Sequence, residues 1–221
     1  LLLSLLLGAI VVAAALGLVA AIPRWWWLAV WGFFLVFSLF LMYISPYVIE
    51  PLFFEFRSVQ NPALEDGSRD LARRAGLQVS KIQQVDASRR SRHSNAYFTG
   101  IGRVKRIVLF DTLLEQMRPP EIFAVLAHEI GHWKLRHVLK RLVLTEMLAL
   151  GALYLAWRVL HWPGLQGLVG MEQASFYARV LILGFLGSIL VFPLTPLFNG
   201  LSRRDEWEAD RFACELVGNA G

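Results

Sequence analysis

Ala127-His128-Glu129-Ile130-Gly131-His132 is the segment around which the other parts of this chain can be placed. It reads H-E-x-x-H, and residues four apart lie on one face of a helix. Both imidazoles can therefore bind one metal ion, and zinc suits two neutral histidines while keeping a position open for water. Glu129 follows the first ligand and can accept a proton from that water. The segment predicts a catalytic zinc site.

The flanking residues predict that this segment is helical. Proline is tolerated in a first helical turn, and Glu121 sits where the helix dipole favours an anion. We expect the helix to run from about Pro120 to His137. Five residues past His132, His137 would then point away from the metal face. We interpret it, like His93, as a surface group.

The composition is that of a membrane protein. Hydrophobic residues make up 56% of the 221 residues, and the mean hydropathy is +0.50. Glu146, inside one of the apolar runs, is interpreted as facing either a cavity near the metal or a contact between helices. Four runs are apolar enough to span a bilayer: 1–22, 25–49, 142–160 and 175–198.

The positive charge is concentrated in one segment. Of the 22 Lys and Arg residues, 16 lie between Arg57 and Arg141, together with eight acidic residues. Basic residues beside membrane spans are typical of the cytoplasmic side, so we expect the metal site to face the cytoplasm, at a bacterial inner membrane or the endoplasmic reticulum. Nucleic-acid binding would rest on this segment alone, and we expect no nucleic-acid partner.

A third ligand is expected after the fourth span. Glu206 and Asp210 are four residues apart and share a helix face, whereas Glu208, the alternative ligand, lies about 200° around the helix from Glu206. Two spans separate His132 from Glu206. An even number of crossings returns the chain to the same side of the membrane, so these ligands can meet. Asp210 is placed to accept a hydrogen bond from a ligand imidazole.

Between the second and third spans, the residue pattern predicts a soluble part. An amphipathic helix is expected over 61–76, and Asp111 is placed to cap a short helix over 112–117. Three short runs rich in Ile, Val and aromatic residues read as strands: 81–87, 94–100 and 106–110.

Four segments carry a family resemblance. H-E-I-G-H at 128–132 is followed across two spans by S-R-R-D-E-W-E-A-D at 202–210. S-N-A-Y-F-T-G-I-G at 94–102 precedes K-R-I-V-L-F-D-T-L-L at 105–114. The combination resembles the integral-membrane zinc metallopeptidases of the type I CAAX prenyl endopeptidase and HtpX-like family.

The resemblance implies that His128, His132 and Glu206 bind one zinc ion and that Glu129 is the catalytic base. It also matches Asp210 to a catalytic Asp that is assigned in the family as a proton donor. A carboxylate beside a zinc-bound imidazole should stay ionised, so we expect an orienting role for Asp210.

The fold class implied is mainly α: polytopic membrane helices with a zincin-like soluble α+β insert that carries a small β-sheet and the H-E-x-x-H helix. We expect two membrane helices and an exit segment over 1–56. The zincin-like part covers 57–140, a transmembrane hairpin covers 141–199, and the helix with the third ligand covers 200–221. The chain begins Leu-Leu-Leu and ends Gly-Asn-Ala-Gly, so we expect a piece of a longer protein. An oxyanion-stabilising residue would then lie beyond Gly221.

The expected function is zinc-dependent hydrolysis of peptide bonds by a membrane endopeptidase. Asn95, Ala96, Tyr97 and Phe98 are expected to form a strand that binds an extended peptide substrate, the alternative being a buried strand that only packs. The substrate is either a prenylated, CAAX-type C-terminus or a damaged membrane protein. The alternative function is a non-catalytic scaffold or transporter that retains a metal site.

Overall fold

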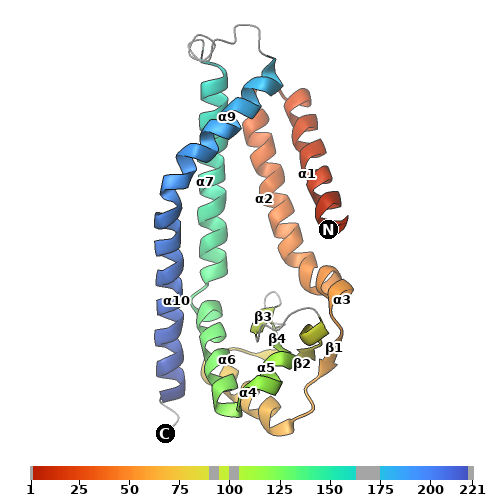
Figure 1. Ribbon diagram of the computed structural model, residues 1–221, viewed down its shortest axis with the longest axis vertical. Coiled ribbons are helices and arrows are strands. Elements are labelled where there is room, and N and C mark those ends of the chain that lie inside the picture. Colours follow the sequence, from red (N-terminus) through yellow and green to blue (C-terminus); the bar gives the residue numbers. More distant parts are fainter. Residues whose placement is uncertain (1, 90–94, 100–104, 163–174, 219–221) are drawn as a thin grey trace. The chain divides into compact units, whose positions relative to one another are not determined.

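The computed structural model describes residues 2–89, 95–99, 105–162 and 175–218. It contains mostly helices and one small mixed sheet (Figure 1), which confirms the expected fold class. Four helices in the described ranges are long and apolar enough to cross a membrane: Leu2–Ala21, Trp26–Phe53, His137–Leu160 and Phe176–Gly218. The protein is therefore a multi-pass integral membrane protein, as its composition indicated.

The chain divides into two compact units, and the first comprises residues 1–39 and 141–198. Its core contains Trp26, Val30 and Leu160, and the Trp26 ring meets Phe176 edge-on at 6.2 Å. Its helical elements are α1 (Leu2–Ala21), α2 (Trp26–Ile44) up to residue 39, α7 (His137–Leu160) from residue 141, α9 (Phe176–Val191), the short turn η3 (Phe192–Leu194) and the first residues of α10 (Thr195–Gly218).

Glu146 lies in the helix packing of this first unit. Its side chain is buried, and its backbone carbonyl accepts a hydrogen bond of 3.0 Å from the Trp31 indole N–H. This contact joins α7 to α2. The contact is made by the backbone, whereas Oε2 of the Glu146 side chain is buried without a hydrogen-bond partner among the described residues, so both interpretations of this side chain stay predictions.

The second unit comprises residues 40–140 and 199–221 and contains the sheet. Its helical elements are η1 (Ser45–Ile49), α3 (Glu50–Phe53), α4 (Pro62–Arg74), η2 (Ala87–Arg89), α5 (Asp111–Gln116), α6 (Pro119–Lys134) and, from residue 199 onward, α10 (Thr195–Gly218). Its strands are β1 (Phe56–Ser58), β2 (Val79–Val85), β3 (Ala96–Thr99) and β4 (Lys105–Phe110).

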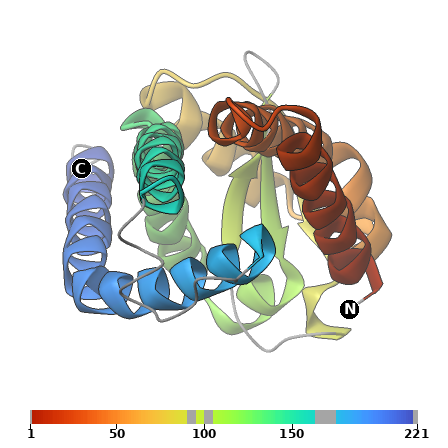
Figure 2. The ribbon, with the colours of Figure 1, turned by 90° about the horizontal axis from the view of Figure 1, so that it is seen from above.

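The four strands form one layer in the order β1-β2-β4-β3. β2 and β4 are parallel, and both outer strands pair antiparallel with their neighbours. β3 is therefore an edge strand, and no further strand pairs with it among the residues that the structure describes. Figure 2 shows this layer from above.

Helices α4 and α6 pack on one face of the sheet. Asn61 caps α4 by accepting hydrogen bonds from the backbone N–H groups of Ala63 and Leu64. Gly76, with a φ of 75°, adopts the left-handed conformation that follows this helix. Apolar residues of both helices and of the sheet form the core: Leu64, Leu71, Ala72, Ile82, Ile107, Leu109, Ile122, Leu126 and Ile130 are among its buried members.

Three local predictions differ from the structure. The sequence pattern missed β1, which has only three residues. Asp111 is the first residue of α5 rather than its cap, and its carboxylate accepts hydrogen bonds from the Ser88 backbone and hydroxyl. Finally, α6 ends at Lys134 and does not continue to His137.

Candidate metal centre

Three side chains from two helices meet in the second unit. His128 and His132 extend from α6, and their Nε2 atoms lie 3.0 Å apart. The Glu206 carboxylate extends from α10, and its Oε2 lies 3.3 Å from each of these nitrogens. Among the described residues this is the one group of His, Cys, Asp or Glu side chains with metal-binding spacing.

The donor set fits a zinc ion. Zinc bound tetrahedrally at about 2.0–2.1 Å holds its ligand atoms about 3.3 Å from one another, close to the separations found here. Two imidazole nitrogens and a carboxylate oxygen also form a known catalytic zinc set, in which the fourth position is left for water. The site could therefore hold a zinc ion without large rearrangement of its three side chains.

A close approach of two backbones brings α10 to α6. A Cβ built on Gly131 would lie 3.0 Å from both the Cα and the carbonyl oxygen of Ala209. Only glycine leaves room for backbone atoms at this distance. Because Ala209 lies between Glu206 and Asp210, this contact sets the distance from α10 to the two imidazoles. The two helices run side by side (Figure 1, Figure 2).

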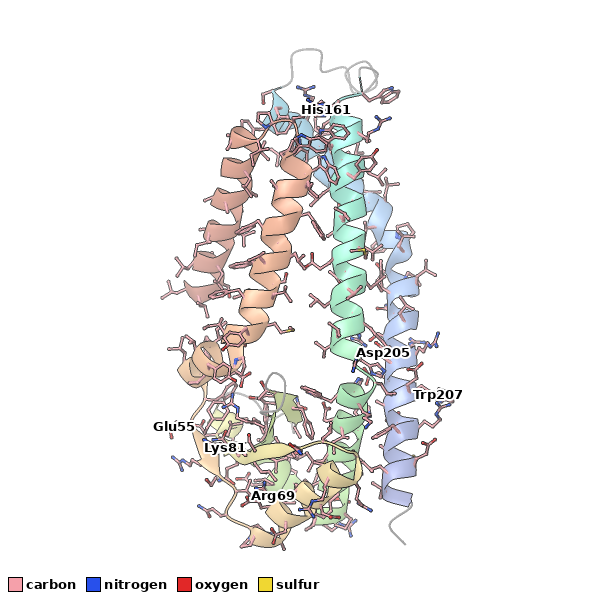
Figure 3. All side chains as sticks on the ribbon, turned by 180° about the vertical axis from the view of Figure 1, so that it is seen from behind. Glu55, Arg69, Lys81, His161, Asp205 and Trp207 are labelled. Atoms are coloured by element: carbon pink, nitrogen blue, oxygen red, sulfur yellow. The ribbon has the colours of Figure 1, made fainter. Side chains whose placement is uncertain are left out.

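The side chains next to Glu206 help to place it on the helix surface. Figure 3 labels its neighbours Asp205 and Trp207 on α10. The Trp207 ring is 64% exposed, and the Arg211 guanidinium lies 5.5 Å from its centre. Trp207 therefore lies on an exposed part of the α10 surface, whereas Glu206 lies beside the α6 histidines.

Asp210 contacts the first histidine. Its Oδ1 lies 2.7 Å from Nδ1 of His128, which is a strong hydrogen bond when the imidazole carries its proton on Nδ1. The Nε2 atom of His128 is then free of a proton and can bind a metal ion. This geometry is the one that an orienting role requires.

The protonation of the site follows from burial and nearby charge. Burial lowers the pKa of His132, and the neighbouring His128 lowers it further, against the opposing Glu206 carboxylate. The neutral imidazole, which is the metal-binding form, is thereby favoured. Burial raises the pKa of Glu129. The charge of His128 acts to lower this pKa, and the Glu206 carboxylate raises it. A bound divalent cation would favour the Glu129 carboxylate and so prepare it to accept a proton.

The interpretation of His137 as a surface group is wrong. Its side chain is 2% exposed, and its Nδ1 lies 2.9 Å from Nδ1 of His132. The reason is the end of α6: the chain leaves the helix at Leu135 and passes through Arg136, whose φ is 57°. A helical wheel extended from His132 therefore does not apply to His137. His93 lies outside the described residues.

Glu208 takes a different position from Glu206, as the helix geometry predicted. Its Oε2 lies 3.4 Å from Nε2 of His137, and its Oε1 accepts a hydrogen bond of 2.9 Å from Arg204. Glu208 therefore supplies no metal-ligand atom to the group formed by His128, His132 and Glu206.

The segment expected to bind substrate lies at the edge of the sheet. Ala96 is buried and Phe98 packs against the same core, whereas Tyr97 faces the opposite side of the sheet. The Tyr97 hydroxyl donates a hydrogen bond of 3.0 Å to Glu50, and burial together with this carboxylate raises the Tyr97 pKa. Side chains of the strand are thus used for packing, and its backbone is what the edge presents.

The hydrogen-bond pattern tells which backbone groups face outward. The Phe110 N–H donates to the Asn95 carbonyl, so Asn95 and Tyr97 point their backbone groups toward β4. By the alternation of an antiparallel pair, Ala96 and Phe98 point theirs away from β4. The Asn95 side chain accepts a hydrogen bond of 2.8 Å from the Ala96 N–H.

Two family descriptions match this chain. That of peptidase family M48 matches residues 58–221. That of the CAAX prenyl protease N-terminal region, described as five membrane helices, matches residues 1–55.

Individual proteins are similar over most of the chain. The uncharacterized metalloprotease YhfN of Bacillus subtilis is 34% identical over 196 residues, which are 88% of this chain and 46% of that protein. The probable CAAX prenyl protease 1 of Schizosaccharomyces pombe is 36% identical over 199 residues, 84% of this chain and 40% of that protein. The crystal structure of S. mikatae Ste24p has a TM-score of 0.85 at 29% identity, covering 97% of this chain and 53% of its own. The chain spans about half the length of these relatives.

Proposed function

Because the chain belongs to peptidase family M48, we propose that it acts as a zinc-dependent membrane endopeptidase. The observation that carries this proposal is the meeting of His128, His132 and Glu206 within ligand distance of one point, with Glu129 next to the first ligand. In this proposal the three side chains hold zinc, and Asp210 orients His128.

The proposed mechanism is hydrolysis by an activated water molecule. Zinc bound at this site would lower the pKa of a water ligand and polarise the scissile carbonyl. Glu129 accepts the proton of that water and later donates it to the leaving amine. Because Glu129 is half-buried, little bulk water competes with it for the proton, which favours direct transfer between Glu129 and the reacting groups.

The proposed substrate platform is the outer edge of β3. An extended peptide can add to an exposed sheet edge through backbone hydrogen bonds, which demand little of the peptide sequence. Ala96 and Phe98 would supply those backbone groups, and the peptide would displace the Asn95 side chain from the Ala96 N–H. β3 contacts α6, the helix that carries Glu129, which supports placing a bound peptide near the metal ligands.

The proposed substrates are CAAX-type C-terminal segments that carry a prenyl group. Support comes from the names of the relatives, several of which are CAAX prenyl proteases, and from the four candidate membrane spans. The proposal places the metal site on the cytoplasmic side of the membrane. The concentration of Lys and Arg in residues 57–141 supports that side.

The test combines metal analysis with a cleavage assay on purified protein. Wild-type protein should bind one zinc ion and cleave a farnesylated C-terminal peptide faster than the same peptide without the lipid. A chelator should abolish cleavage. Glu129→Gln should keep the zinc and lower kcat by a factor of about 10²–10⁴, as loss of a general base does.

Each outcome has a distinct meaning. Unchanged turnover in Glu129→Gln would contradict the assignment of Glu129 as the general base. A wild-type protein that binds zinc but has no peptidase activity would favour a scaffold or transporter. Equal rates on lipidated and unmodified peptides would favour general cleavage of membrane proteins.

A further inference from the structure

A buried histidine supports one of the two ligand histidines. His137, at the start of α7, is almost fully buried, and its Nδ1 faces Nδ1 of His132 at 2.9 Å. The two rings are 5.0 Å apart and nearly perpendicular. On its other side, Nε2 of His137 lies 3.4 Å from Oε2 of Glu208, a contact of charge rather than an aligned hydrogen bond, and this nitrogen is buried without a hydrogen-bond partner in the described part of the chain.

We propose that His137 is a positioning residue, which holds the His132 imidazole in the tautomer and orientation that metal binding requires, and that Glu208 holds His137 in turn. This inference rests on the proposed assignment of His132 as a zinc ligand. It adds a residue that the H-E-x-x-H pattern does not contain.

The proton positions along this row have a single arrangement for neutral rings. Binding through Nε2 leaves the His132 proton on Nδ1, which then donates to His137. The Nδ1 atom of His137 must therefore accept, and its own proton must lie on Nε2, toward the Glu208 carboxylate. A carboxylate at that end favours this tautomer of His137 over the other, and so favours the metal-binding tautomer of His132.

The two ligand histidines are supported in different ways. His128 contacts Asp210 directly, and the Asp210 side chain is 69% exposed. His132 contacts His137, which lies 3.4 Å from the Glu208 carboxylate. The Glu208 side chain is 22% exposed and accepts a hydrogen bond from Arg204. Water competes less for the buried support, so His137 should restrict the His132 ring more tightly than Asp210 restricts His128.

The backbone between the two histidines shows how the contact is made. On a continuous helix, His137 would lie about 140° around the axis from His132. Arg136 instead adopts a left-handed conformation, with a φ of 57°, which costs a non-glycine residue about 1 kcal/mol or more. The Lys134 ammonium fixes the end of α6 by donating to the Ala75 carbonyl. The turn that follows brings His137 back beneath His132.

Substitutions of His137 can separate positioning from simple packing. Leucine has a similar volume and no polar atom. Asparagine places an oxygen near the position of Nδ1 and can accept the His132 proton, but it is too short to reach Glu208. Both variants should be purified as the full chain, and their zinc affinity measured by competition with a chelator. The melting temperature of the metal-free protein, measured in excess chelator, reports packing separately.

His137→Leu should lower zinc affinity about 10–100-fold, the range observed when hydrogen-bond partners of metal-binding histidines are removed. His137→Asn should recover most of that loss although it packs less well. Glu208→Gln should give a smaller loss than His137→Leu and carries the test if His137→Leu does not fold.

Three results would overturn the proposal. The first is wild-type zinc affinity in His137→Leu or, where that variant does not fold, in Glu208→Gln. The second is an affinity in His137→Asn as low as that in His137→Leu while their metal-free melting temperatures agree. The third is a wild-type protein that binds no zinc, which would remove the ligand assignment itself and is distinguished by the absence of binding in every variant.

Discussion

The α6–α10 contact and the β3 edge form the two sides of the proposed active site, and they use different chemistry. The helix contact presents side chains: two imidazoles and a carboxylate held at 3.0–3.3 Å from one another. The strand presents backbone groups, while Tyr97 and Phe98 use their side chains for packing. Metal binding requires particular residues, whereas peptide binding at an edge requires a particular position in the sheet. The two sides should therefore respond to different substitutions.

The largest effect is expected where the two helices touch. Gly131→Val would place a branched side chain against the Ala209 backbone, where even a Cβ lies at 3.0 Å. Backbone atoms cannot rotate away, so α10 must move and carry Glu206 from the imidazoles. Zinc affinity should fall by more than about 100-fold, because one of three ligands is displaced.

Gly151→Val is the matched control, because nothing lies within 4 Å of a Cβ built on Gly151 in α7. It makes the same change in a helix with open space and should leave zinc affinity unchanged. Wild-type zinc affinity in Gly131→Val would show that the helix contact does not set the ligand geometry.

The edge strand should show the opposite pattern, with substrate binding lost and metal retained. Ala96→Pro removes an N–H that points away from β4, which an edge strand tolerates. KM should rise about 10-fold, roughly the contribution of one backbone hydrogen bond, with zinc content unchanged. Ala96→Gly keeps the N–H and serves as the control. Loss of zinc equal to the loss of substrate binding would argue against the strand as a peptide platform.

Asp210 distinguishes orientation of a ligand from donation of a proton. If Asp210 orients His128 through their contact of 2.7 Å, Asp210→Asn should weaken zinc binding about 10-fold. If it donated a proton to the leaving group, kcat would fall while zinc affinity stayed the same. Measuring both quantities on one preparation decides between the two roles.

The smallest effect is expected at Asp111, the residue that follows β4. Burial is the largest single influence on the Asp111 pKa and raises it, but hydrogen bonds from the Ser88 hydroxyl and from backbone N–H groups together outweigh burial and lower the pKa. A lowered folded-state pKa gives stability that is present above the ordinary Asp value of about 3.9 and lost as the pH falls through the folded pKa.

Ser88→Ala removes one of these bonds at an exposed position and should reduce stability near pH 7 by less than about 1 kcal/mol. The melting temperatures of variant and wild type should converge as the pH falls through the folded-state pKa of Asp111. Zinc affinity should not change. A difference in stability that persisted at low pH would mean that the charge of Asp111 is not its cause.

Much of the fold could be predicted because its signals are local. Apolar runs long enough to cross a bilayer mark the four spans, and alternating or periodic apolar residues mark α4, β2 and β4. Asn61 and Gly76 mark the ends of α4 by the backbone hydrogen bonds and φ angle that they supply. β1 was missed because three residues are too few for a pattern.

The end of α6 could not be read, because its left-handed residue is Arg136 rather than Gly or Asn. The predicted position of His137 was wrong for the same reason, because it assumed that α6 continues to this residue. Nothing in the local sequence distinguishes this helix end from its continuation, whereas contacts distant in the chain, such as that of Lys134 with the Ala75 carbonyl and that of His137 with His132, accompany it in the structure.

The type of chemistry could be predicted from the residues alone: the spacing of His128 and His132, the adjacent Glu129, and a carboxylate two membrane crossings later. These features follow from helix geometry and from the sidedness of membrane spans. The way in which those groups are held became visible only in the folded chain. The approach of Gly131 to Ala209, the contact of His137 with His132 and the edge position of β3 join residues far apart in the chain or across a helix break. Such contacts depend on packing between elements, for which a single sequence carries no periodic signal.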